Sequence, residues 1–277
     1  MCGSCSLACG ADTWWLGDKL TRLTAAPCEE VNSWWICDRG RYGIPSENNA
    51  DGNLIRRQGE QVPVNHEEAV GRALEVVSKG DGSCVVLCGS RSTNEELASL
   101  ATLSDKLGST FSPFAGASPA TRGFIANLGE LELRDLGRLG EFDRAIVLGR
   151  DPLAIHPILA LRMGEATAAG LAVTVVGAPT DVEPEGFSRR WTRLNEDPVA
   201  WAAGAGKTEL AGDDKLLLII DETLVRSGSL DGSILDLCRS RGGACSVSLT
   251  SDGFNRRGLL TAAGDREDDN DALLAAL

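Results

Sequence analysis

The stretch MCGSCSLACG, residues 1–10, together with WWICDRG, residues 34–40, decides how this chain is organised. Its four cysteines follow the spacing C-x2-C-x3-C-x27-C: Cys2, Cys5, Cys9 and Cys37. Three thiolates close together in sequence can wrap three corners of a four-iron cube, and a fourth from a distant segment closes the cage. The spacing therefore predicts a [4Fe–4S] cluster on these four thiolates.

Two other states of these thiols stay open. Zinc is the competing metal, but zinc ribbons usually offer two separated C-x2-C knuckles, and here the distal cysteine stands alone. Unmetallated thiols are the third possibility. Small residues around the first three cysteines favour the cluster, because they let backbone N–H groups turn towards cluster sulfides and tune the reduction potential. These residues are Gly3, Ser4, Ser6, Ala8 and Gly10.

Two arginines follow the distal cysteine closely. A cluster with net negative charge favours nearby guanidinium groups, and positive charge raises its potential. We therefore expect Arg39, and to a smaller extent Arg41, to tune the cluster; a turn with solvated arginines is the alternative reading. The remaining five of the nine cysteines are expected to pack as small apolar side chains: Cys28, Cys84, Cys88, Cys238 and Cys245.

Composition limits the function further. The chain has 277 residues, with 27 basic and 40 acidic side chains, so its net charge is 27 − 40 = −13. An acidic balance argues against a nucleic-acid partner, which needs a basic surface. No apolar run is long enough for direct membrane insertion, and no export signal is evident at the start. We expect a cytoplasmic protein with reduced thiols, which could sit at the periphery of a membrane complex.

From residue 57 onward, helix-like segments alternate with short apolar strands, which is typical of an α/β fold with a parallel sheet covered on both faces. The expected helices are residues 67–78 and 94–107, the second starting at Thr93 or Asn94 and ending at Gly108. The expected strands are residues 83–88, 144–148, 172–176, 216–220 and 245–249.

The chain therefore divides into a small [4Fe–4S] cluster domain at residues 1–56, an α/β region at residues 57–264 and an acidic C-terminal tail at residues 265–277. Residues 20–23 and 31–37 are the expected strands of the first domain. A domain this small needs a metal to stabilise it.

Several stretches resemble the molybdopterin oxidoreductase superfamily, and most closely the large iron–sulfur (G-type) subunit of complex I, NADH:quinone oxidoreductase. Besides the cysteine spacing, they are residues 34–43, 55–70, 88–109, 144–163 and 254–264. The resemblance implies a [4Fe–4S] domain followed by a Rossmann-like parallel-sheet region of the molybdopterin-oxidoreductase type. It also implies two partners in the same complex, a ferredoxin-like iron–sulfur subunit and an NADH-oxidising flavoprotein subunit.

Three departures from the family pattern modify this expectation. The ferredoxin-like domain that precedes the cluster in G-type subunits has no counterpart here, and neither has the C-terminal barrel that completes pterin binding. In catalytic members, a residue after the "LGS" helix ligates molybdenum or tungsten. Residues 113–123 align there and place Gly116 at the ligand position, with Ser118 a poor substitute. Glycine has no ligating side chain, so we expect no active molybdenum site and no bound molybdopterin.

Three other features of the sequence indicate a function more weakly than the cysteine spacing does. Residues 204–208, GAGKT, resemble the end of a P-loop, but Trp201 stands where its first glycine belongs. His66 is expected at a helix start, on the surface or as a cap, and His156 is expected to be structural. Four tryptophans in the first domain are expected to shield the cluster from water, although an exposed pair could mark a partner interface. They are Trp14, Trp15, Trp34 and Trp35.

The main hypothesis is thus an iron–sulfur electron-transfer subunit of a multi-subunit NAD(P)H-linked oxidoreductase, without its own substrate site. Two rivals stay open. The chain could be the pterin-binding part of a split molybdenum or tungsten enzyme of the formate or formylmethanofuran dehydrogenase type, or a structural subunit whose cluster lies off the electron path.

Overall fold

The protein is described by a computed structural model, which covers residues 1–43, 52–79, 84–89, 91–113, 119–133, 135–178, 186, 190–230 and 232–251. Its largest unit is a five-stranded sheet in the order β11-β10-β7-β8-β9, in which every neighbouring pair is parallel. The strands are β7 (Arg144–Leu148), β8 (Ala172–Val176), β9 (Thr192–Leu194), β10 (Leu216–Asp221) and β11 (Cys245–Thr250).

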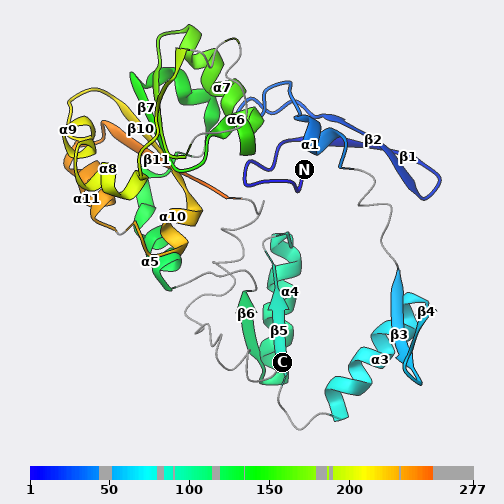
Figure 1. Cartoon of the computed structure of the whole chain (residues 1–277). Coiled ribbons are helices and arrows are strands. Elements are labelled where there is room, and N and C mark those ends of the chain that lie inside the picture. The colour runs from blue at the N-terminus through cyan, green and yellow to red at the C-terminus, as the bar shows by residue number, and fades with distance from the viewer. Residues whose placement is uncertain are drawn as a thin grey trace.

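Helices cover both faces of this sheet, so the predicted α/β architecture is confirmed (Figure 1). Alternate residues along each strand point to opposite faces, which is why β10 contributes Leu218 to one buried cluster and Leu217 to the other. The first face is covered by α5 (Pro119–Leu128), η1 (Gly129–Leu131), α8 (Pro198–Ala203), α9 (Gly206–Leu210), α10 (Glu222–Arg226) and α11 (Ser233–Ser240). The second is covered by η2 (Leu136–Glu141) and α7 (Pro157–Ala168), which follows α6 (Pro152–Ile155).

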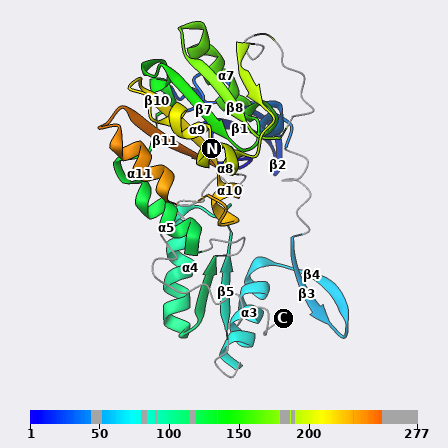
Figure 2. The same cartoon turned by 60° about the vertical axis from the view of Figure 1, so that its left-hand side comes forward.

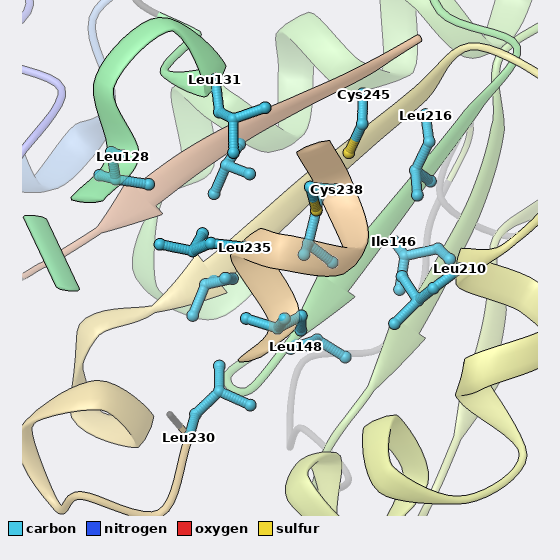
Figure 3. Close-up of a cluster of buried hydrophobic side chains, with 14 of the residues drawn as sticks. Leu128, Leu131, Ile146, Leu148, Leu210, Leu216, Leu230, Leu235, Cys238 and Cys245 are labelled. Carbon is cyan, nitrogen blue, oxygen red and sulfur yellow. The ribbon is translucent and has the colours of Figure 1, made fainter. Parts of the chain in front are cut away.

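The first-face core is one continuous cluster of mostly aliphatic side chains (Figure 3). Leu148, Leu216 and Leu235 are fully buried there. Cys238 and Cys245 belong to the same core, 1% and 3% exposed, as expected for cysteines outside the cluster spacing. Burial of this many aliphatic side chains is the main source of stability for the sheet.

The first 43 residues form a separate unit, here called the N-terminal module, which lies beside α6 in Figure 1. It contains an antiparallel hairpin of β1 (Ala11–Leu16) and β2 (Lys19–Ala25), followed by α1 (Asp38–Arg41). The expected strand at residues 20–23 lies within β2. The expected strand at residues 31–37 is wrong: these residues form turns, and only Ser33 bridges to Cys28. Ser33 has φ of +49°, a left-handed conformation that interrupts an extended chain.

The middle of the chain forms two smaller pieces. One consists of the hairpin β3 (Asn53–Arg57) and β4 (Glu60–Val64) with α3 (His66–Lys79). The other consists of β5 (Val85–Cys88), α4 (Asn94–Leu107) and β6 (Thr110–Pro113). In Figures 1 and 2, β5 lies apart from the five-stranded sheet. The expectation that this strand is covered on both faces is therefore wrong, and Leu87 is 44% exposed.

Helix α4 has the predicted ends. Thr93 caps it through a capping box with Glu96, and Gly108 ends it in a left-handed conformation with φ of +59°. The predicted bounds of β7 and β8 are also confirmed. No helix in the described part of the chain has the length and apolar content needed to span a bilayer. The acidic tail at residues 265–277 lies outside the described residues, and the three-part division of the chain stays a prediction.

Candidate metal centre

The first three cysteines lie on one tight loop at the start of the N-terminal module. The Cys2 N–H donates to the Cys9 carbonyl at 2.8 Å, which closes the loop at its base. Within it, the Ala8 N–H donates to the Cys5 carbonyl at 3.2 Å, and Ala8 has φ of +49°. A small side chain at position 8 suits this left-handed turn, in agreement with the run of small residues seen in the sequence.

The structure brings all four thiols to one corner of the module. Cys5 and Cys9 are buried, 7% and 5% exposed, whereas Cys2 and Cys37 are half-buried. Burial, followed by the other three thiols, raises the pKa of Cys9 to about 12. Burial also raises the pKa of Cys5, while a hydrogen bond from the Leu7 backbone and the charge of Arg39 lower it. Thiols that perturb one another in this way lie within electrostatic reach of each other.

Helix α1 packs against the cysteine loop at Cys2. It begins directly after Cys37, and its Gly40 is buried. A Cβ atom at Gly40 would lie 2.9 Å from the Cys2 Sγ and 3.1 Å from the Ile36 Cγ1, closer than such atoms can approach without a shift. The absence of a side chain at Gly40 therefore leaves open space beside the Cys2 sulfur, here called the Gly40 cradle, which any larger residue would fill.

A buried asparagine, which the sequence did not single out, holds the module together. Asn32 is fully buried, and its Oδ1 accepts a hydrogen bond from the Gly10 N–H at 2.8 Å. Its Nδ2 donates to the carbonyls of Ala26 at 3.1 Å and Trp35 at 2.9 Å. One side chain thus ties the end of the cysteine loop to the end of β2 and to the segment that leads into Cys37.

The cysteine loop is anchored on the carboxyl end of the parallel sheet. The Ser6 N–H donates to the Ser251 carbonyl, and the Ser251 N–H donates to the Ser6 Oγ, both at 3.0 Å. Leu7 packs against the second-face core, as does Leu153. The Arg39 guanidinium donates to the Ile155 carbonyl, so the arginine predicted to tune the cluster also joins the module to α6.

Two further contacts fix the module to the second face. The buried Arg162 guanidinium donates to the Glu29 carbonyl at 3.0 Å and pairs with Glu165 at 2.9 Å. The Leu136 N–H donates to the Glu30 carbonyl at 2.7 Å. Together with the Ser6 and Arg39 contacts, they attach the cysteine corner to a rigid core.

The four thiols do not form the ligand set of a single ion. Among the residues that the structure describes, no group of three or more His, Cys, Asp or Glu side chains is arranged to hold a metal ion. A [4Fe–4S] cluster on these four thiols therefore stays a prediction. The donor chemistry, the buried loop and the cradle at Gly40 fit such a group.

The other predicted site residues lie elsewhere. Arg41 is exposed, and its charge does not figure among those that shift the pKa of Cys5 or Cys9. Gly116, the expected position of a lost molybdenum ligand, lies outside the described residues. All four tryptophans of the module are exposed by half or more, so the expectation that they shield the cysteines from water is not met in this chain.

The sheet has a second feature of interest at its carboxyl edge. Strand order reverses between β7 and β10, and ligands commonly bind outside such a switch point. Here Asp221, at the end of β10, is 1% exposed and pairs with Arg150 just after β7. A Cβ at Gly149 would lie 2.5 Å from the Asp221 Cβ. The chain's own side chains therefore occupy the space nearest the switch point.

The fold gives no functional role to the GAGKT stretch or to the two histidines. The GAGKT stretch begins α9 directly after α8 rather than after a strand, which is not the context of a P-loop. His66 begins α3, as expected, and His156 is 1% exposed between α6 and α7.

Fold and site together define a class: an α/β protein with helices on both faces of a parallel sheet and a cysteine-rich module docked at the carboxyl edge of that sheet. No protein-family model matches the chain. The chain is 32% identical over 169 residues to NADH-quinone oxidoreductase subunit 3 of Thermus thermophilus. It is 35% identical over 100 residues to the G-type NADH-quinone oxidoreductase subunit of Streptomyces coelicolor.

These likenesses are partial. They cover 59% and 35% of this chain, but it spans only 20% and 12% of the two relatives. Among solved structures, the fold is similar to a chain of the formyltransferase/hydrolase complex from Methylorubrum extorquens, determined in complex with methylofuran. The TM-score is 0.52 at 18% identity, over 76% of this chain and 64% of the other. Both curated relatives are subunits of NADH-quinone oxidoreductase, which agrees with the resemblance seen in the sequence.

Proposed function

We propose that this chain is the iron–sulfur electron-transfer subunit of a multi-subunit NAD(P)H-linked oxidoreductase, with one [4Fe–4S] cluster on four cysteine thiolates and no active molybdenum site. The observation that carries the proposal is the corner formed by two half-buried and two buried thiols, with Gly40 packed against the Cys2 sulfur. The likeness to NADH-quinone oxidoreductase subunits supports the class of complex.

Each residue has a defined part in this proposal. The ligands are Cys2, Cys5, Cys9 and Cys37. A bound [4Fe–4S] cluster supplies a centre that takes up and releases one electron at a time. The Leu7 backbone and the Arg39 charge both lower the pKa of the Cys5 thiol, so both stabilise negative charge on that sulfur. Burial of Cys5 and Cys9 keeps water away from two of the four corners.

The partners follow from the same proposal. A subunit without its own substrate site must receive and pass on electrons through neighbouring proteins. We assign these roles to a ferredoxin-like iron–sulfur subunit and an NADH-oxidising flavoprotein of the same complex. The contacts of Ser6, Arg39 and Arg162 to the sheet domain would hold the cluster at a fixed distance from such partners.

Anaerobic reconstitution of the full chain with iron and sulfide tests the cluster. We expect four irons per chain, a broad visible absorption and an EPR signal on reduction. Replacing any one of the four ligands by serine should abolish or strongly weaken the signal. Cys28→Ser is the matched control, because Cys28 belongs to the same module but lies outside the ligand spacing. A chain that binds zinc, or no metal, under these conditions would overturn the proposal.

The fold likeness to the methylofuran-bound complex favours a second candidate, the pterin-binding part of a split molybdenum or tungsten enzyme. Gly116 argues against a protein ligand to that metal, and the Arg150–Asp221 pair fills the space closest to the switch point of the sheet. Stoichiometric molybdenum or tungsten with an extractable pterin in the intact native complex would establish this candidate in place of the first. Turnover that continues without reduction of the cluster by NADH would instead favour an off-path structural cluster.

A further inference from the structure

Two cysteines of the first-face core lie opposite one another. Cys238 is in the last turn of α11, and Cys245 begins β11, seven positions further along the chain. Both are buried, and in Figure 3 their sulfur atoms point towards one another. A side-chain hydrogen bond joins the two thiols. The fold thus pairs two thiols that have no part in the cysteine corner of the N-terminal module.

The pair lies beneath a turn at the surface of the sheet domain. Residues 241–244 form this turn, and its Gly242 and Gly243 are exposed. The two glycines have φ of +60° and +91°, and a Cβ atom at either would meet nothing within 4 Å. Glycine adopts such angles at low steric cost, so the turn can adjust when the two sulfurs approach to the S–S bond length of about 2 Å.

The surroundings of the pair favour a thiolate at Cys238. The hydrogen bond with Cys245 lowers the pKa of Cys238, and the charges of Arg241 and Arg239 lower it further, against the effect of burial, which raises it. The same hydrogen bond, together with burial, raises the pKa of Cys245. Cys238 therefore loses its proton first, while Cys245 keeps its own. A thiolate beside a protonated thiol is the arrangement of a redox-active dithiol.

Arg241 supplies a buried positive charge near this pair. Its side chain is 4% exposed, its Nη1 donates to the Leu210 carbonyl at 2.7 Å, and its Nη2 donates to the Asp214 Oδ1 at 3.0 Å. Asp214 also pairs with Arg144, so one carboxylate serves two guanidinium groups. The Arg241 Nε is buried, and among the described residues no acceptor lies within hydrogen-bond distance of it. Negative charge on the Cys238 sulfur would help to balance this buried cation.

Cys88 shows what burial alone does to a thiol in this chain. It is 4% exposed on β5, and burial raises its pKa to about 11. A thiol that only packs in an apolar core stays protonated and unreactive. Cys238, with a second thiol and a buried guanidinium nearby, lies in a different environment, which packing alone does not explain.

We propose that Cys238 and Cys245 form a redox-active dithiol that hydrogen peroxide converts to an intramolecular disulfide. The Cys238 thiolate attacks one peroxide oxygen, so that an S–O bond forms and the O–O bond breaks; the hydroxide that leaves takes up the proton that Cys238 had released. Cys245 then loses its proton and attacks the Cys238 sulfur, so that an S–S bond forms and the S–O bond breaks. The two thiols lose two electrons in total, and the peroxide is reduced to two waters.

This inference goes beyond the proposed function and does not depend on the cluster. Disulfides in a reducing compartment are mostly transient and redox-sensing. We therefore expect the dithiol to be the resting form and the disulfide to be the form that peroxide produces. A thiol reductant such as dithiothreitol should restore the dithiol.

Peptide mapping of the full chain tests the reaction. The anaerobically purified chain is treated with hydrogen peroxide, quenched in acid, alkylated with N-ethylmaleimide in denaturant and digested with trypsin. Cleavage after arginine places Cys238 on residues 227–239 and Cys245 on residues 242–256. We expect these two peptides as one disulfide-linked species, which dithiothreitol added before alkylation abolishes. Oxidation of Cys238 should be at least tenfold faster than oxidation of Cys88.

Single substitutions separate the roles of the two thiols. In Cys245→Ser the sulfenic acid has no thiol partner, so dimedone should label Cys238 after peroxide treatment. In Cys238→Ser, Cys245 should stay reduced. Cys84→Ser is the matched control and should leave the linked species unchanged. Dimedone labelling of Cys245 in Cys238→Ser, at the rate of Cys238 in the other variant, would contradict the assigned order of attack.

The unsubstituted chain decides the proposal even where a variant fails to fold. Absence of the linked species, or oxidation of Cys238 no faster than that of Cys88, would overturn it. The four cysteines of the corner lie on other tryptic peptides, residues 1–19 and 23–39, so their state does not affect this measurement. A chain without an EPR signal that still forms the linked species would refute the proposed function and leave the dithiol established.

Discussion

Ser6 and Ser251 lie 245 positions apart in the chain and are joined by two hydrogen bonds, one from each backbone N–H. Ser6 belongs to the cysteine loop, and Ser251 directly follows β11. Because β11 is paired with the fully buried β10, the loop is tied to the most rigid part of the sheet. The geometry of the cysteine corner therefore depends on the fold of the sheet domain and not on the N-terminal module alone.

Ser6→Ala should reveal this dependence. The substitution removes the Oγ that accepts from the buried Ser251 N–H, and we expect the free energy of unfolding to fall by about 1 kcal/mol. Hydrogen exchange at the Ser251 amide should also become faster. Ser78→Ala, which removes a hydroxyl from exposed helix α3, serves as the control and should change neither quantity appreciably. Equal effects of the two substitutions in urea denaturation would contradict the anchoring role.

Gly40→Ala should impair cluster assembly without unfolding the chain. The added methyl group would meet the Cys2 Sγ at 2.9 Å and the Ile36 side chain at 3.1 Å, so helix α1 or the Cys2 sulfur must move. We expect lower iron content and a weaker visible absorption after anaerobic reconstitution. Gly71→Ala is the control, since a Cβ there meets nothing within 4 Å. Full iron content in Gly40→Ala would show that the cradle has no role in binding.

Asn32→Ala should be strongly destabilising. The side chain is fully buried and makes three hydrogen bonds to the backbone of Gly10, Ala26 and Trp35, all of which lose a partner together. We expect a loss of about 3 kcal/mol or more in the free energy of unfolding, measured by tryptophan fluorescence in urea. Asn127→Ala, which removes one hydrogen bond from an exposed helix position, should have a much smaller effect. A similar loss in both variants would rule out a special role for Asn32.

The sheet was the most predictable part of the fold. The segments 144–148 and 172–176 consist mostly of buried aliphatic residues, and they form β7 and β8 with the predicted bounds. Helix α4 was equally predictable, because the Thr93 capping box and the Gly108 C-cap act locally. Signals that depend on the nearest few residues are present in the sequence itself.

Features that depend on particular side-chain contacts were not predictable. Residues 31–37 are largely apolar and were expected to form a strand, but the buried Asn32 amide bonds to nearby carbonyls and folds the segment into turns. β5 was expected to be covered on both faces, yet within the described part of the chain its one paired strand is β6. The tryptophans were expected to shield the cluster from water, because burial tunes the reduction potential of a cluster, but they are exposed. No local pattern distinguishes an indole that packs inside from one that stays exposed.

The role of the four cysteines as ligands stays a prediction, and the residues that support them in the structure were not predictable. The cysteine spacing alone selects the four thiols that the structure gathers in one corner. Ser6, Asn32 and Arg162 have no such signature, because each acts through a contact that joins separate segments of the chain. Gly40 was a potential signal, since it lies three residues after the distal cysteine, but only the packing around the Cys2 sulfur gives it meaning.

Arg39 and Arg41 should differ in their effect on the reconstituted cluster. The Arg39 charge lowers the pKa of the Cys5 thiol, so it stabilises negative charge at the site, whereas the Arg41 charge has no such effect on that thiol. We expect Arg39→Gln to lower the midpoint potential in an EPR-monitored redox titration, with Arg39→Lys closer to the unsubstituted chain. Arg41→Gln should change the potential less. A larger shift from Arg41→Gln than from Arg39→Gln would reverse the assignment.

The ion-pair network around Asp214 should make the sheet domain sensitive to acid. A hydrogen bond from Arg144, together with one from the buried Arg241, holds the pKa of Asp214 at about 2 against an ordinary value of 3.8. A carboxyl group with a depressed folded-state pKa stabilises the fold above its unfolded pKa and loses that contribution as the pH falls through the folded value. The contribution of Asp214 is therefore complete above about pH 4 and disappears towards pH 2.

Asp214→Asn tests whether the Asp214 carboxylate stabilises the fold at neutral pH and loses that effect in acid. Because the side chain is 27% exposed, solvent screening reduces the effect, and we expect a loss of about 1 kcal/mol in unfolding free energy at pH 7. Between pH 4 and pH 2 the difference between the variant and the unsubstituted chain should shrink, since protonation removes the same charge. Glu141→Gln breaks a fully exposed pair with Arg138 and should leave stability at pH 7 nearly unchanged. A difference that grows as the pH falls would mean that the Asp214 carboxylate does not stabilise the fold.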